Sequence, residues 1–69
     1  MTREQLADMP TDVLQKMFDR CLIDLRLWEL LAEQESQQRV KDFCVKSARR
    51  YERLAAAIRE ELLARDPNP

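Results

Sequence analysis

The 69-residue chain lacks glycine and histidine altogether and has only three prolines. Without glycine there is no Gly-rich loop to hold a phosphate, and without histidine the usual general acid or base at neutral pH is missing. No serine or cysteine has an evident base beside it that would activate it as a nucleophile. We therefore predict that the protein is not an enzyme and binds no cofactor.

Cysteine is scarce as well, with only Cys21 and Cys44 in the sequence. Two widely spaced cysteines do not make a disulfide framework, and without histidine a zinc site would need both thiolates plus carboxylates. Each cysteine falls on an apolar helical stripe, where it would pack as a small hydrophobic side chain. The sequence also lacks a run of 18 apolar residues and a secretion leader, so we expect a cytoplasmic protein without a membrane span.

The residues that are abundant favour helices, chiefly Leu, Ala, Arg, Glu, Gln and Lys. We predict an all-α fold, an antiparallel two-helix hairpin preceded by a short helical turn. A chain of this length rarely gains more than about 5 kcal/mol from its own core. A single copy is therefore expected to be marginally stable.

Local signals place the helices along the chain. We expect a single domain, 1–69, with an N-terminal turn at 1–10, a first helix at 11–33, a bend at 34–38, a second helix at 37–65 and a frayed tail at 66–69. Thr2 and Gln5 match a capping box, and Pro10 ends that turn. Thr11 is the expected N-cap of the first helix and Ser36 that of the second. The alternative is one continuous helix, because no glycine or proline forces the chain to turn.

Apolar residues recur at helical spacing on both helices. The stripe of the first helix that should face the second consists of Leu14, Met17, Phe18, Cys21, Leu25, Trp28 and Ala32. The matching stripe of the second consists of Val40, Phe43, Cys44, Ser47, Tyr51, Leu54, Ile58 and Leu62. A helix that is apolar on a further side needs a further partner, and the residues expected to meet one are Leu22, Ile23, Leu27, Trp28, Leu30 and Leu31. We predict a homodimer that forms a four-helix bundle, with binding to a protein target as the other use of this surface.

The net charge of −1 conceals an asymmetry between the two halves of the sequence. Residues 1–35 carry four basic and eight acidic side chains, whereas residues 36–69 carry eight basic and five acidic ones. Ion pairs between the helices, on otherwise solvated faces, are the simpler interpretation. The alternative is a docking site for an anion or an acidic partner, formed by Arg39, Lys46, Arg49, Arg50 and Arg53.

The leading hypothesis for function is a non-enzymatic helical binding protein, a regulator or inhibitor of a larger protein. An amphipathic helix pair offers the apolar anchors and charged flanks that helix-in-groove recognition uses. In size and build, without a shared motif, the chain is similar to the small plasmid and bacteriophage hairpins that regulate RNA pairing or block host proteins. The alternatives are an RNA-binding dimer, disfavoured by the pI of about 5.4, and a structural subunit of a larger helical assembly.

Overall fold

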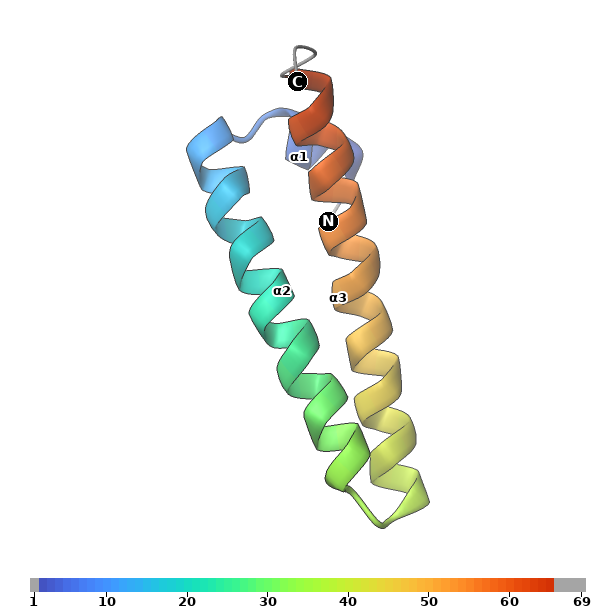
Figure 1. Cartoon of the computed structure of the whole chain (residues 1–69). Coiled ribbons are helices and arrows are strands. Elements are labelled where there is room, and N and C mark those ends of the chain that lie inside the picture. The colour runs from blue at the N-terminus through green and yellow to red at the C-terminus, as the bar shows by residue number, and fades with distance from the viewer. Residues whose placement is uncertain (1, 66–69) are drawn as a thin grey trace.

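The computed structural model describes residues 2–65, and these form helices joined by short connections (Figure 1). They are α1 (Arg3–Ala7), α2 (Thr11–Gln34) and α3 (Gln38–Arg65). The two long helices, α2 and α3, lie side by side as an antiparallel hairpin, with α1 folded against the end of the hairpin farthest from the bend. The predicted all-α hairpin is confirmed. The expected frayed tail at 66–69 lies outside the described residues.

The first helix, α1, is short and is held at both ends. At its start the Thr2 hydroxyl accepts a hydrogen bond from the Gln5 N–H at 3.2 Å, and the Gln5 side chain accepts one from the Thr2 N–H at 2.8 Å. This is the predicted capping box. At its end Arg65 of α3 donates to the carbonyls of Leu6 and Ala7 at 3.0 and 2.9 Å. Leu6 is buried, so α1 adds a third layer to the hairpin.

α2 begins at Thr11 as predicted, but its N-cap lies one residue earlier than expected. Pro10 occupies the N-cap position in an extended conformation, and its carbonyl accepts the Leu14 N–H at 3.0 Å. Thr11, the predicted N-cap, is instead the first residue of the helix. Its hydroxyl accepts a hydrogen bond from Arg65 at 3.2 Å, so it ties α2 to the C-terminal end of α3.

The bend between the long helices is short. It spans residues 35–37, so α2 ends one residue later and α3 begins one residue later than expected. The prediction of Ser36 as the N-cap of α3 is wrong, because the Gln37 carbonyl accepts the first helical bond, from the Lys41 N–H at 2.9 Å. The Gln37 N–H donates to the Glu35 carboxylate at 3.0 Å, which satisfies that group and closes the turn. One continuous helix is excluded.

The seam between α2 and α3 follows the predicted periodicity closely, with two exceptions on α3. Every predicted seam position from Leu14 to Ala32 is buried or half-buried. On α3, Val40 and Phe43 were expected in the seam but are exposed by 40% and 61%. The small residue Cys44 is buried in the seam here, and the larger side chains of Val40 and Phe43 lie at the edge of the seam.

The core is concentrated at one end of the molecule. Its central cluster consists of Leu6, Leu14, Cys21, Ala55 and Ile58, which α1, α2 and α3 contribute together. Nearer the bend, the buried residues Ala32, Cys44 and Ala48 are small. We call residues 22–45, where the hairpin has only two layers, the bend half. Its seam buries little apolar volume, and this determines where the candidate site lies.

Candidate functional site

Large apolar side chains are exposed mainly in the bend half. On α2 these are Leu22, Ile23, Leu27 and Leu31, and on α3 they are Val40 and Phe43. Ile23, Leu27 and Leu31 are 55%, 52% and 50% exposed, at steps of four residues along one side of α2. Leu30, expected on the same surface, is half-buried. We call Ile23, Leu27 and Leu31 the outer stripe, since they lie on the side of α2 away from the seam.

An aromatic pair borders the bend half. The rings of Trp28 on α2 and Phe43 on α3 have centroids 5.7 Å apart at an interplanar angle of 77°, an edge-to-face contact between the helices. Trp28 is half-buried, whereas Phe43 is the more exposed partner. Edge-to-face pairs contribute about 0.5–1.5 kcal/mol beyond area burial. The pair therefore stabilises the hairpin near the bend and still presents ring surface to solvent.

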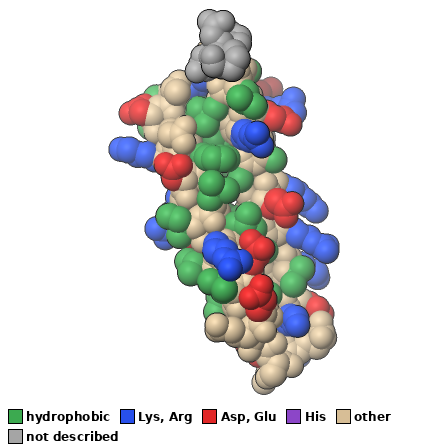
Figure 2. Space-filling model, viewed as in Figure 1, with side chains coloured by type: hydrophobic (Ala, Val, Ile, Leu, Met, Phe, Trp, Pro, Cys, Tyr) green, Lys and Arg blue, Asp and Glu red, His purple; other side chains and the backbone are tan. Residues whose placement is uncertain are grey.

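A groove of about 570 Å³ lies between α2 and α3 within the bend half and just beyond it. Its apolar lining consists of Leu25, Ala32, Val45 and Ala48, and its polar lining of Glu29, Glu33, Arg49 and Glu52. Figure 2 shows hydrophobic side chains along the line between the two long helices in the half near the chain ends, and acidic and basic side chains close to that line nearer the bend. Small residues from both helices create the groove. Ala32 and Ala48 are buried, and their methyl side chains do not fill the space between the helices.

The sequence did not identify this groove. From the sequence, the acidic residues of the first helix, Glu29 and Glu33 among them, are expected on a solvated face or in ion pairs with the second helix. The sequence signal for the groove is a pair of small residues, Ala32 on one helix and Ala48 on the other, at positions that face each other in the hairpin. To predict the groove one must know how each helix is rotated about its axis, and the apolar periodicity of one helix does not define that rotation.

The expected ion pairs between α2 and α3 do not form within residues 2–65. The ion pairs found there are Arg3–Glu60, Arg20–Asp24 and Arg65–Glu61. The first joins α1 to α3, and the other two link residues four apart on one helix. The charge asymmetry of the sequence therefore appears at the surface, not as a network of pairs across the seam.

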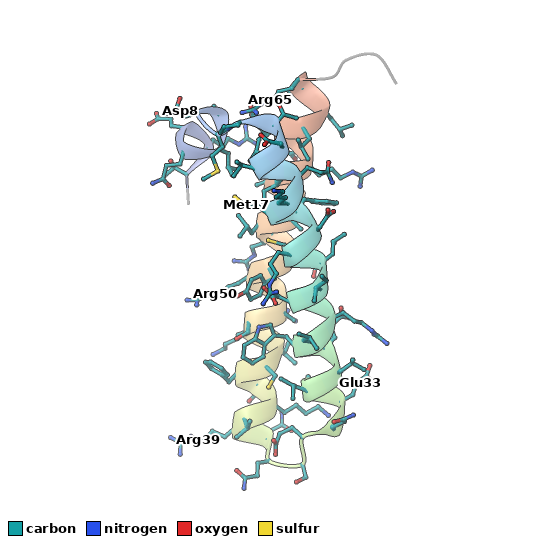
Figure 3. The ribbon with its side chains drawn as sticks, turned by 90° about the vertical axis from the view of Figure 1, so that its left-hand side faces the viewer. Asp8, Met17, Glu33, Arg39, Arg50 and Arg65 are labelled. Atoms are coloured by element: carbon teal, nitrogen blue, oxygen red, sulfur yellow. The ribbon has the colours of Figure 1, made fainter. Side chains whose placement is uncertain are left out.

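The five basic residues singled out on α3 are all exposed. Arg39 and Arg50 project from one side of the hairpin, and Glu33 projects from the other (Figure 3). Helical spacing places Lys46 with Arg39 and Arg50. Arg49 instead lines the groove together with acidic residues, and Arg53 lines an adjoining cavity of about 420 Å³. Around α3, Arg53 and Lys46 lie between Arg49 and Arg50, so the five basic residues follow one flank of the helix, with Arg49 at its edge beside the groove.

Both cysteines are free and buried. Burial raises the pKa of the Cys21 thiol above its ordinary value, and the charge of the Asp24 carboxylate raises it further. A thiol with a raised pKa stays protonated and is a poor nucleophile near neutral pH. Cys21 belongs to the central core cluster, where it packs as a small apolar side chain.

Judged by their side chains and helix lengths, residues 2–65 meet the requirements of neither a metal site nor a membrane span. No group of three or more histidine, cysteine, aspartate or glutamate side chains there is arranged to hold a metal ion. No helix there combines the length and apolar character needed to cross a membrane. Comparison of the chain with protein-family models, with curated proteins and with solved structures finds no match.

Proposed function

We propose that this protein is a non-enzymatic helical binding protein that self-associates and acts as a regulator or inhibitor of a larger protein. One observation carries the proposal: α1 covers the hairpin at one end only, and the other end exposes large apolar side chains. Elsewhere in residues 2–65, only Val13 and Leu63 among large apolar residues are exposed to a similar degree. Clustered apolar exposure of this kind is typical of a surface that meets another protein.

Self-association through the outer stripe supplies the layer that the bend half lacks. A two-fold axis near Leu27 would bring Ile23 of one copy beside Leu31 of the other, because the stripe then runs antiparallel to itself. Fully burying a leucine or isoleucine contributes about 1.5–3 kcal/mol. Six such side chains from two copies are enough to add substantially to the stability of a 69-residue chain. The product is a four-helix bundle with the α2 helices at its centre.

The experiment is size-exclusion chromatography with light scattering on wild type and on Leu27→Asp. We expect a dimer for the wild type and a monomer for Leu27→Asp at the same micromolar concentration, because two carboxylates at the two-fold axis repel each other and cannot be desolvated. The matched control is Leu63→Asp, which places the same charge at a residue that is 60% exposed on α3, outside the bend half. A folded monomeric wild type would contradict the proposed self-association.

The two alternative functions predict different behaviour. RNA binding needs several phosphates to be contacted along one continuous basic surface. The acidic residues Glu29, Glu33 and Glu52, which line the groove together with Arg49, oppose a polyanion and favour a protein partner instead. A structural subunit of a larger helical assembly would give a mass well above that of a dimer in the same light-scattering experiment.

A further inference from the structure

The α2 rim of the groove is acidic, whereas the α3 rim carries two arginines and one glutamate. On α2 the rim holds Glu29 and Glu33. On α3 it holds Arg49, followed by Glu52 and then by Arg59, which lines an adjoining cavity of about 220 Å³. None of these five side chains forms an ion pair within residues 2–65. The charges on both rims are therefore available to a partner.

Apolar residues line both the groove and the adjoining cavity. The groove and the adjoining cavity share the lining residues Leu25 and Glu52, and we call the two together the channel; its lining on α2 extends from Phe18 to Glu33. Fifteen helical steps between these two residues correspond to about 22 Å, or about four turns of a helix. The small buried residues in the floor, Ala48 among them, allow another helix to approach closely.

We propose that this channel binds an amphipathic helix of the partner protein, flanked by basic residues on one side of its apolar stripe and by acidic residues on the other. The basic flank lies against Glu29 and Glu33, and the acidic flank lies against Arg49 and Arg59. The inference rests on the proposed function, since it specifies the chemistry of the protein that is bound.

The difference between the rims is what selects this partner. A helix with basic residues on both flanks meets Arg49 and Arg59 on one side, and a helix with acidic residues on both flanks meets Glu29 and Glu33 on the other. Placing like charges opposite each other at an interface costs up to several kcal/mol and therefore opposes binding. An extended polyanion such as RNA meets the same acidic rim. A helix with opposite charges on its two flanks pairs with Glu29 and Glu33 on one rim and with Arg49 and Arg59 on the other, where the two arginines outnumber Glu52.

Three designed peptides test this inference. Each is a helix of about 18 residues with the same leucine and alanine stripe, and the flanks are lysine on one side and glutamate on the other, lysine on both, or glutamate on both. Fluorescence anisotropy at low ionic strength measures their binding to the full chain. We expect the mixed peptide to bind about tenfold more tightly than either of the others. Equal affinities for the three peptides would overturn the proposal.

A charge reversal in the protein makes the test specific to the groove. The double variant Glu29→Lys/Glu33→Lys makes the α2 rim basic, so its preference should switch to the peptide with glutamate on both flanks. The matched control Asp19→Lys/Asp42→Lys changes the net charge equally at two exposed residues that do not line the groove. The control should keep the wild-type order of affinities. An unchanged order in the Glu29→Lys/Glu33→Lys variant would place the binding elsewhere.

The outcome also separates this inference from the proposed self-association. The outer stripe and the groove lie on different sides of α2, so Leu27→Asp should dissociate the dimer and leave the order of peptide affinities unchanged. A monomeric wild type that ranks the peptides as expected would contradict self-association and support the groove. A dimeric wild type that binds the three peptides with equal affinity would contradict helix binding in the groove but not self-association.

Discussion

Residue size divides this molecule into two unequal parts. At the end that carries α1, the fully buried residues are large, and Leu14 and Ile58 are both 0% exposed. At the bend, the buried residues are Ala32, Cys44 and Ala48, and the large apolar side chains are at the surface. Most of the stability from apolar burial therefore comes from the α1 end, while the bend half holds the candidate site.

Leu14→Ala tests this division. Truncation of a fully buried leucine costs about 2–5 kcal/mol, through lost burial and the cavity that remains. In a chain this small that loss is expected to lower the urea midpoint strongly or to unfold the protein, as followed by circular dichroism.

The control for Leu14→Ala is Leu63→Ala, which truncates a leucine that is 60% exposed. A change at such a surface position is usually within about 0.5 kcal/mol. If the two variants had the same midpoint, the core would not lie where the structure places it.

At the scale of the helices, Arg65 is the residue on which the docking of α1 depends. It donates hydrogen bonds to α1 and to Thr11, and its ion pair with Glu61, at 2.9 Å, holds the guanidinium in position. Three structural elements thus meet at one half-buried side chain. A five-residue helix such as α1 cannot be stable by itself, because helix nucleation is unfavourable.

Arg65→Gln should therefore release α1 selectively. Charge-assisted hydrogen bonds contribute about 1.5–3 kcal/mol, so amide hydrogen exchange should accelerate in residues 3–7 by one to two orders of magnitude. Exchange in the middle of α2 and α3 should change much less. Arg53→Gln, at an exposed arginine of the same helix, is the control and should leave α1 protected. Uniform acceleration over all three helices would show that α1 and the hairpin unfold together.

The helices themselves were largely predictable, because helix formers, caps and apolar periodicity are local properties. The capping box at Thr2 and Gln5 and the α2 stripe were found from the sequence. Phe43 was misplaced because its exposure depends on the rotation of α3 against α2. The groove could not be predicted for the same reason, since Glu29 and Arg49 line one groove only once α2 and α3 have packed together.

At the scale of the whole molecule, self-association couples stability to concentration. If the dimer is the stable form, mass action favours the folded state as the protein concentration rises. We expect the thermal midpoint of the wild type to rise by roughly 4 °C for each tenfold increase in concentration. Leu27→Asp should show no such dependence. Differential scanning calorimetry over a hundredfold range makes the measurement, and a constant wild-type midpoint would mean that unfolding involves a monomer.

The position of Trp28 has a spectroscopic consequence. It is the only tryptophan in the chain, and it lies in the bend half against Phe43, outside the central core cluster. Its emission is therefore a local signal from the end of the molecule that carries the candidate site, whereas circular dichroism averages over all the helices. Comparison of the two signals during titration or heating separates an event at the bend from unfolding of the whole chain, without any added label.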